Sequence, residues 1–371
     1  MDHTSTHNPL YQVYDNSNSA WEAMLAAITN AKHSIYWEMY ILVDDEAGKP
    51  FLDILQQKAK EGVTVKLLID GFGSFAMPHK RIESLINAGV DVRIFHERKH
   101  RYRGLWSKMI SRTHRKILVV DEHIGFIGGV NVQKHMQDWL DIHVRITGKP
   151  VRSMLRAFAK MYLIAGGEKK EVKQLLKYTF RVKGNSTEFI YDEPGRYKKG
   201  ARMRKVYTDA LLKARERVIL FSPYYFPDKR FLRALWQAKK RGVRVDLLIP
   251  FRADVRLATY LAYGVFAITN KMGVNIHLLP KMMHGKGMVV DDEYAVIGSS
   301  NIEQGSFYDN YEANVKIRDK RVIKKLYVIL NRWQSEAKLL KAEEWKKRSA
   351  LTKIKEWLVL RLYKLWHPRA K

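Results

Sequence analysis

Cysteine is absent from the 371-residue sequence, so disulfide bonds and thiolate-bound zinc are excluded, and a reducing compartment suits the composition. No apolar run reaches the roughly eighteen residues that a membrane-spanning helix needs, so we expect no such helix. The first residues have neither a basic start nor an apolar stretch, and we therefore expect no signal peptide. Acidic residues are also few: the sequence has 38 Asp and Glu but 67 Lys and Arg, which gives a net charge of +29. Such a charge attracts polyanions, either nucleic acid or an anionic membrane surface.

The remaining composition is that of a folded, globular protein. Hydrophobic residues make up 46% of the chain and charged residues 28%, which is unlike a disordered sequence. A chain of this length can form two or three domains that each bury a core.

Two short segments of the chain repeat one another. The first runs from Thr113 to Asp121 and the second from Met283 to Asp291, and each contains the pattern His-x-Lys-x4-Asp. In both copies a Gly follows the His by 14 positions and an Asn follows it by 17. One such pattern is weak, but two copies with the same downstream residues make coincidence an implausible explanation. The shared His, Lys and Asn positions are His114, Lys116, Asn131, His284, Lys286 and Asn301.

The pattern of strands and helices is repeated as well, which predicts two homologous α/β halves with mixed sheets. Segment 51–70 aligns with 231–250, segment 34–43 with 217–226, and segment 88–94 with 272–278. Residues 1–18 are expected to be a polar lead-in. After them we expect helices over 19–31, 51–61 and 80–88, which alternate with strands over 34–43, 63–69 and 90–95. The expected divisions are a first domain 1–147, a connecting segment 148–200, a second domain 201–335 and a C-terminal tail 336–371.

The repeated residue types suit chemistry at a phosphodiester. If the segment from Lys116 onward is a strand, His114 and Lys116 project from the same face, and so do His284 and Lys286. Two copies facing one another would place one His on each side of phosphorus, with Lys and Asn side chains around its oxygens. One His attacks and the other protonates the leaving oxygen, and because the lysines supply charge we expect neither a metal nor another cofactor.

These motifs resemble the paired HKD motifs of the phospholipase D superfamily, and the resemblance extends over about residues 15–330. Within that superfamily the sequence is most similar to short bacterial cardiolipin synthases without an N-terminal transmembrane hairpin. The resemblance implies two pseudo-two-fold related domains with one active site at their interface. It further implies a covalent phosphohistidine on His114, with His284 as general acid and base. The expected activity is transfer of a phosphatidyl group, from phosphatidylglycerol to an alcohol or a second phosphatidylglycerol.

The resemblance also assigns roles to acidic residues. An acid shortly after each motif is expected to orient the His of that same motif, which pairs Asp141 with His114 and Glu312 with His284. Asp121 and Asp291 of the motifs are interpreted as structural residues that end a strand and fix a turn. The first motif has Gly129 where many members have Ser, so that only Ser299 supplies this hydroxyl.

Two basic segments are candidates for contact with a membrane. Segment 98–110, part of a run with eight Lys and Arg over 98–116, mixes cations with aromatic residues, and segment 351–366 has the pattern of a basic amphipathic helix. The expected apolar face of that helix consists of Leu351, Ile354, Trp357, Leu358, Leu362 and Leu365. Peripheral attachment to the cytoplasmic face of a bacterial-type membrane, with anionic phospholipids as substrates, is therefore expected.

Three alternatives stay open. Segment 351–366 could instead pack on the protein core. A phospholipase D-type hydrolase or an HKD-type nuclease would use the same motifs, although a nuclease has little use for a Trp- and Leu-rich face, so nucleic acid is a less favoured partner. A binding protein without catalysis conflicts with two intact motifs. The sequence does not determine the oligomeric state.

Overall fold

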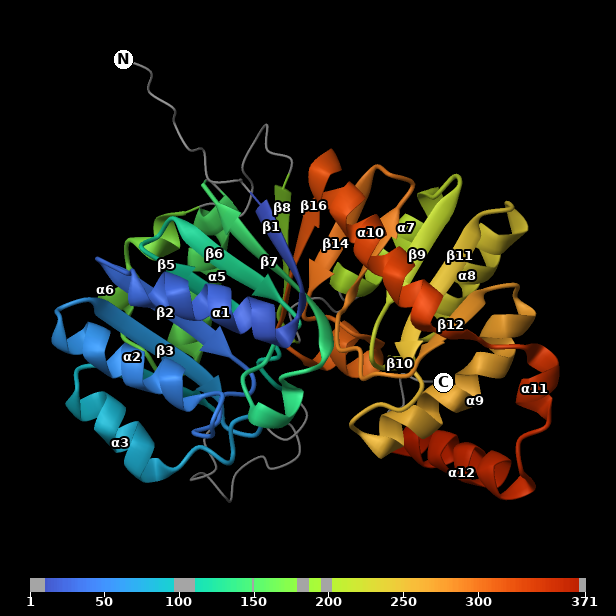
Figure 1. Cartoon of the computed structure of the whole chain (residues 1–371), viewed down its shortest axis with the longest axis horizontal. Coiled ribbons are helices and arrows are strands. Elements are labelled where there is room, and N and C mark those ends of the chain that lie inside the picture. The colour runs from blue at the N-terminus through green and yellow to red at the C-terminus, as the bar shows by residue number, and fades with distance from the viewer. Residues whose placement is uncertain (1–10, 97–110, 149, 179–186, 195–201, 367–371) are drawn as a thin grey trace, which may run out of the picture.

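The structure, a computed structural model, describes residues 11–96, 111–148, 150–178, 187–194 and 202–366, with the side chains of 363–366 left aside. Within these residues two mixed β-sheets stand side by side, and helices cover their outer faces (Figure 1). The predicted α/β architecture with two halves is confirmed. Segment 98–110, one of the two expected membrane contacts, lies outside the described residues.

The first sheet has the strand order β1-β7-β6-β5-β2-β3-β4. Strands β2, β3 and β4 are parallel, and the remaining neighbours are antiparallel. Its strands are β1 Tyr11–Asn16, β2 Ser34–Met39, β3 Thr64–Asp70, β4 Asp91–Phe95, β5 Ile117–Val120, β6 Ile124–Gly128 and β7 Leu140–Thr147. The helices of this half are α1 Ser17–Thr29, α2 Lys49–Lys60, α3 His79–Asn87 and the short 3-10 turn Lys134–Met136.

The second sheet has the order β17-β12-β11-β9-β13-β14-β16-β8, again with three parallel strands, β9, β11 and β12. Its strands are β8 Thr187–Asp192, β9 Arg217–Phe221, β11 Arg244–Pro250, β12 Asn275–Leu279, β13 Gly287–Val290, β14 Tyr294–Gly298, β16 Glu312–Ile317 and β17 Lys338–Leu339. A separate two-stranded sheet pairs β10 Tyr225–Phe226 with β15 Ile302–Glu303. The helices are α7 Arg202–Lys213, α8 Lys229–Lys240, α9 Arg256–Lys271, α10 Lys320–Glu336, the π-helical turn Gly305–Asp309, α11 Ala342–Lys346 and α12 Ala350–Trp366.

The two sheets match strand for strand, as the repeat in the sequence predicts. The order β7-β6-β5-β2-β3-β4 corresponds to β16-β14-β13-β9-β11-β12. The register agrees too, because Gly128 pairs with His143 and the equivalent Gly298 pairs with Asn314. Asp141 and Glu312 each lie two residues before these partners, so they occupy equivalent positions in the two halves.

Some expected element limits were wrong. Residues 11–16 are not a polar lead-in but form β1, which pairs with β7. Helix α1 begins at Ser17 because the Asn16 side chain caps it, accepting from the Ser19 amide at 2.9 Å. The strand expected over 34–43 ends at Met39, and β5 begins at Ile117, so that Lys116 precedes the strand in which we expected it.

The core between the sheets joins the two halves. Inward-facing Ile127, Val144, Ile297 and Val315 from β6, β7, β14 and β16 belong to one buried cluster. Segment 148–200 also reaches this core through helix α5, Pro150–Ile164, and it supplies β8, the edge strand of the second sheet next to β16. The remaining elements of that segment are α6 Lys169–Val172 and a 3-10 turn Leu175–Lys177. Burial of this shared apolar surface fixes the relative position of the halves.

The C-terminal helix α12 lies along the lower edge of the molecule in Figure 1, against α9. The two helices approach closely, since a Cβ built on Gly264 would lie 2.2 Å from the Leu360 side chain. Glu356 is buried and accepts from the Arg348 guanidinium at 2.7 Å. Leu351, Trp357 and Leu362 of the expected apolar face are 71%, 54% and 63% exposed. The helix therefore docks on the protein with a different side from the one we expected to be apolar.

Candidate active site at the domain interface

Each His-bearing segment crosses from its own half and pairs with the other half. Thr113 forms a parallel bridge with Tyr311, and the His114 amide donates to the Tyr311 carbonyl at 3.0 Å. In the same way Met283 bridges to Leu140, and the His284 amide donates to the Leu140 carbonyl at 2.6 Å. Both His-bearing segments are thus held next to the residue that precedes the acid of the opposite half.

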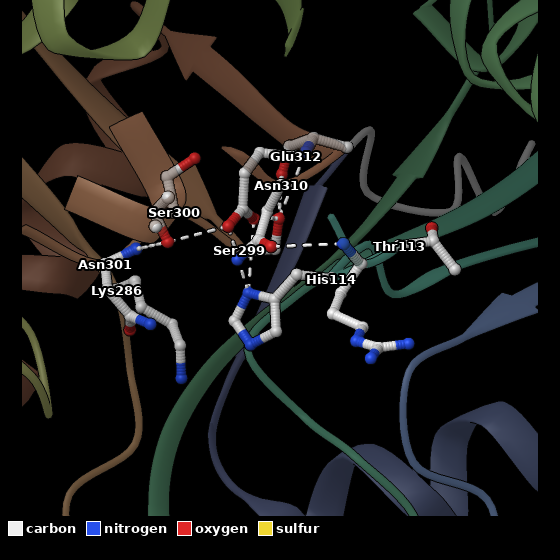
Figure 2. Close-up of polar contacts among 12 residues, drawn as sticks. Thr113, His114, Lys286, Ser299, Ser300, Asn301, Asn310 and Glu312 are labelled. Atoms are coloured by element: carbon white, nitrogen blue, oxygen red, sulfur yellow. Dashed lines mark hydrogen bonds and ion pairs between the residues drawn. The ribbon is translucent and has the colours of Figure 1, made fainter. Parts of the chain in front are cut away.

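This exchange determines which acid contacts which imidazole. Nδ1 of His114 lies 3.1 and 3.2 Å from the two carboxylate oxygens of Glu312 (Figure 2). Nδ1 of His284 lies 3.0 Å from Oδ2 of Asp141. The expected pairing of each His with the acid that follows its own motif was therefore wrong. In both pairs Nδ1 is engaged by the carboxylate, so the other ring nitrogen, Nε2, is the atom available for chemistry.

The two motif lysines are buried beside the imidazoles. Lys116 donates from Nζ to the His114 carbonyl at 2.7 Å, and Lys286 makes the equivalent contact with the His284 carbonyl. Burial lowers the pKa of Lys116 well below its usual range, and the positive charge of Lys286 lowers it further. Burial likewise lowers the pKa of Lys286 to about 7. Two ammonium groups without an anion between them are unfavourable, so the site is suited to an anionic group.

The pKa values of the two carboxylates are shifted in opposite directions. Burial raises the pKa of Asp141, and the charge of Lys286 offsets only part of this rise. Burial would also raise the pKa of Glu312, but the charge of His114, its hydrogen bond and the charge of Lys116 lower it below its ordinary value. Burial lowers the pKa of His114, which favours the neutral imidazole, the form that can act as a nucleophile.

The two acids have different neighbours, since Glu312 lies beside Ser299 and Asp141 lies beside Gly129. Ser299 donates through its hydroxyl to Glu312, and so does Ser306 at 2.7 Å. At the equivalent position in the first half, a Cβ on Gly129 would lie 2.2 Å from Oδ1 of Asp141. The shorter Asp141 chain occupies the space that a serine side chain would need. The lack of a serine at 129 is therefore coupled to the presence of Asp rather than Glu at 141.

Asn131 and Asn301 are both buried at the ends of the loops that follow β6 and β14. The Asn131 side-chain oxygen accepts from the Ile41 amide at 3.3 Å, and its carbonyl accepts from the Trp21 indole at 2.8 Å. The Asn301 backbone amide donates to Ser306, whereas its side-chain oxygen has no partner among the described residues. The Asn301 side chain thus keeps an unpartnered oxygen among the described residues, while the Asn131 side chain stabilises the neighbouring segment at Ile41.

The motif aspartates lie away from the imidazoles. Asp121 accepts from the amides of Lys32, His33 and Ser34 at 2.7–3.2 Å, at the start of β2. Asp291 accepts from the amides of Arg215, Glu216 and Arg217 at 2.6–2.9 Å, at the start of β9. Both have positive φ, 50° and 45°, within the hairpin turns after β5 and β13. Their carboxylates thus fasten a turn to the beginning of a neighbouring strand.

Other residues at the centre were missed by the sequence reasoning. The Tyr40 ring lies edge-on to the His114 ring at 4.9 Å between centroids, and its face is 4.9 Å from the Lys116 ammonium. Arg115 is buried and reaches across the interface to the Asp192 carbonyl at 3.3 Å. Glu38 is fully buried and accepts from the Thr113 hydroxyl. Of these residues, Glu38 could have been identified from the sequence, because it is a charged residue within the apolar strand 34–39.

No three His, Asp or Glu side chains in the described parts of the chain are grouped as metal ligands would be. None of the helices among these residues has both the length and the apolar character needed to span a membrane.

Two halves of one α/β fold, each bringing a His–Lys motif to a shared centre, define a phospholipase D-like protein. The family model described as "Cardiolipin synthase, PLD-like domain" matches residues 24–162 and 207–334. The chain belongs to this family.

Similar proteins agree with this assignment. Cardiolipin synthase 2 of Bacillus anthracis is 33% identical over 322 residues, covering 84% of this chain and 62% of that protein. Cardiolipin synthase A of Pseudomonas fluorescens is 32% identical, covering 84% of this chain and 65% of that protein. The chain thus spans somewhat less than two thirds of these relatives. Minor cardiolipin synthase ClsB of Bacillus subtilis is 28% identical, covering 91% and 84%. Phosphatidylserine synthase of Haemophilus influenzae has the same fold, with a TM-score of 0.74 at 16% identity over 96% of this chain and 92% of that chain.

Proposed function

We propose that this protein transfers a phosphatidyl group from phosphatidylglycerol to an alcohol, with a second phosphatidylglycerol as the acceptor that yields cardiolipin. The observation that carries the proposal is the pair of buried imidazoles, each held at Nδ1 by a carboxylate of the opposite half. Family membership supports the same activity. Among the described residues, the exposed apolar face of α12 favours a lipid over a nucleic acid.

The first step forms a covalent intermediate. Neutral His114 attacks phosphorus through Nε2, and the bond from phosphorus to the glycerol oxygen breaks. His284 donates a proton to that oxygen, so that glycerol leaves as a neutral alcohol. The phosphorylated imidazole carries positive charge, which the Glu312 anion at 3.1 Å stabilises. Lys116, Lys286 and the Asn301 amide bind the non-bridging oxygens.

The second step reverses the roles at the other side of phosphorus. The acceptor hydroxyl gives its proton to His284 while its oxygen bonds to phosphorus, and the bond to His114 Nε2 breaks. Burial lowers the pKa of His284 well below its usual range, which favours the base form in this step. The phosphate anion between the two lysines favours the protonated form again when the next donor binds.

We also propose that the protein attaches peripherally to the cytoplasmic face of a bacterial-type membrane. Helix α12 presents exposed Leu351, Trp357 and Leu362, with exposed Lys353 and Lys355 along the helix. Basic and aromatic residues on an amphipathic helix suit an anionic leaflet.

Two loops also expose apolar side chains. The loop after β3 carries Phe72 and Phe75, which are 60% and 69% exposed, and the equivalent loop after β11 carries exposed Phe251 and Val255, followed by exposed Leu257 at the start of α9. The first loop adjoins the site, because Asp70 at its start accepts from the Thr113 amide at 3.0 Å. Apolar loops at the catalytic centre would bring it to the bilayer surface, where the donor lies.

The direct experiment uses purified protein and vesicles of phosphatidylglycerol. Mass spectrometry should detect cardiolipin and glycerol in equal amounts, and His114→Ala should abolish both. Phosphatidic acid in place of cardiolipin would identify a hydrolase. Cleavage of DNA without lipid turnover would refute the proposal.

A further inference from the structure

A carboxylate outside the catalytic set, Asp254, lies on the loop between β11 and α9. Oδ1 of Asp254 accepts from the Tyr224 hydroxyl at 2.8 Å. The loop is fixed at both sides, because the Phe251 amide donates to the Leu279 carbonyl at 2.8 Å and the Ala253 amide donates to the Thr259 hydroxyl at 3.0 Å. Asp254 itself is exposed, so a substrate group can reach it.

Its partner Tyr224 belongs to the wall of the second motif. Ser222, two residues earlier, donates to the Tyr224 carbonyl at 2.7 Å and accepts from the Ile302 amide at 3.1 Å. Ile302 directly follows Asn301, so one short turn supports both Tyr224 and the Asn301 loop. Burial lowers the pKa of His284 and of Lys286, and in both cases the negative charge of Asp254 opposes that change. The hydrogen bonds of Tyr224 and Ser222 thus hold Asp254 on the part of the centre that the second half supplies.

The first half has no equivalent acid. Alignment of β3 with β11 places Ser74 at the position of Asp254, and Ser74 is buried. Its hydroxyl donates to the Tyr40 carbonyl at 3.0 Å and accepts from the Leu42 amide at 3.0 Å. At this position of the two loops the carboxylate thus belongs to the second half, which also carries His284, the imidazole that handles the leaving and the incoming hydroxyl in the proposed reaction.

A carboxylate near two lysines and two imidazoles repels a phosphodiester, so phosphate binding does not explain it. It does suit hydroxyl groups, which donate strong hydrogen bonds to a carboxylate anion. A glycerol head group has a second hydroxyl beside the one that reacts. We propose that Asp254, held in place by Tyr224, binds this neighbouring hydroxyl and so makes polyols the preferred leaving groups and acceptors. This inference rests on the proposed phosphatidyl transfer and identifies where its alcohol binds.

The test compares two acceptors that differ by one hydroxyl, propane-1,2-diol and propan-1-ol. Both are supplied at equal concentration with a dihexanoyl p-nitrophenyl phosphatidyl ester, whose leaving group has no hydroxyl for Asp254 to bind, and the two products are quantified by mass spectrometry. The wild type should prefer the diol by about tenfold or more, as expected for a hydrogen bond to a charged group. Asp254→Asn should bring the product ratio close to one, mainly through a higher KM for the diol, and leave transfer to propan-1-ol within about threefold of the wild type.

Tyr224→Phe should reduce the preference by a smaller factor, because the carboxylate stays but loses its anchor. Asp292→Asn, the same change at an exposed turn residue, is the matched control and should keep the wild-type ratio. A ratio that Asp254→Asn leaves unchanged would overturn the inference, and so would equal loss of both products, which indicates a structural role. A wild type that transfers to neither alcohol would instead overturn the proposed function, and this inference with it.

Discussion

His114 and Glu312 are 198 positions apart in the sequence, yet Nδ1 of the one lies 3.1 Å from Oε1 of the other. The His284 and Asp141 pair repeats this contact across the same interface at 3.0 Å. Neither half contains a complete catalytic pair, so the chemistry depends on how the halves pack. The two pairs also differ, because two serine hydroxyls donate to Glu312, whereas within the described residues Asp141 accepts instead from the Ile142 backbone amide.

A donor with a good leaving group distinguishes the role of Glu312 from that of Asp141. With a p-nitrophenyl phosphatidyl ester, departure needs no proton, so only the His114 side limits the first burst of nitrophenol. Glu312→Gln should slow this burst by about 10²–10⁴-fold, comparable with loss of the acid that orients a catalytic His. Asp141→Asn should leave the burst nearly intact and slow the reaction with phosphatidylglycerol. If Asp141→Asn alone slowed the burst, the nucleophile would be His284.

The same ester identifies the nucleophile directly. His284→Ala should still release one equivalent of nitrophenol and then stall, because nothing takes the proton of the acceptor. The stalled phosphatidyl group should be found by mass spectrometry on the peptide that contains His114. His114→Ala should give no burst. A covalent adduct on the His284 peptide would reverse the assignment of the two imidazoles.

The lowered pKa of Lys286 predicts that kcat/KM, which reflects the free protein, depends on pH differently from kcat, which reflects the protein with bound donor. Its pKa is lowered from 10.5 to about 7 by burial, so the free site loses this positive charge as the pH rises through about 7. We expect kcat/KM for the donor to fall above that pH, by up to about tenfold per pH unit, while kcat falls only at higher pH because bound phosphate holds the proton. Lys286→Arg keeps its charge throughout and should remove the alkaline fall in kcat/KM. If the fall persists in this variant, another group causes it.

Gly129 allows a test of the coupling between residues 129 and 141. In Gly129→Ser the new Cβ would lie 2.2 Å from Oδ1 of Asp141 and 2.9 Å from the His284 carbonyl oxygen. We expect a loss of about 1–3 kcal/mol in the free energy of unfolding and a marked loss of activity. Adding Asp141→Ala should recover much of the stability but not the activity, since the clash disappears along with the acid. Denaturant unfolding of the two single variants and the double variant measures this, and additive effects would disprove the coupling.

The sequence predicted the two halves and the paired His and Lys residues of the centre, but not which acid contacts which imidazole. His114 and His284 could be found because the motif repeats, and the duplicated α/β order follows from hydrophobic periodicity. Which acid reaches which imidazole depends on the backbone pairing of Thr113 with Tyr311 and of Met283 with Leu140. That pairing is a long-range feature of packing, which no local pattern encodes. Tyr40 was missed for a similar reason, since a tyrosine in an apolar strand is ordinarily a core residue.

Membrane attachment can be separated from catalysis by changing the exposed apolar residues and keeping the catalytic ones. Because α12 docks on α9 through the side that includes Leu360, substitutions on its exposed side should leave the fold intact. The double change Leu351→Ser with Trp357→Ser should weaken binding to anionic vesicles by about tenfold, the loss of roughly 1.4 kcal/mol of apolar burial. Turnover of a dispersed short-chain donor should stay near the wild-type rate. Phe72→Ser with Phe75→Ser tests the loop after β3 in the same way.

The control for this comparison is Ile86→Ser with Val328→Ser. These two residues are also exposed, at 51% and 59%, but lie on α3 and α10, outside the proposed membrane surface. If this control weakens vesicle binding as much as the α12 variant, binding reflects general apolar exposure rather than a defined face. If the α12 variant loses turnover of the dispersed donor to the same extent as vesicle binding, the helix supports the fold instead. If the active site faces the membrane, the α12 and loop variants should lose vesicle binding but keep turnover of the dispersed donor. In these variants only the transfer of the donor from the bilayer to His114 is impaired.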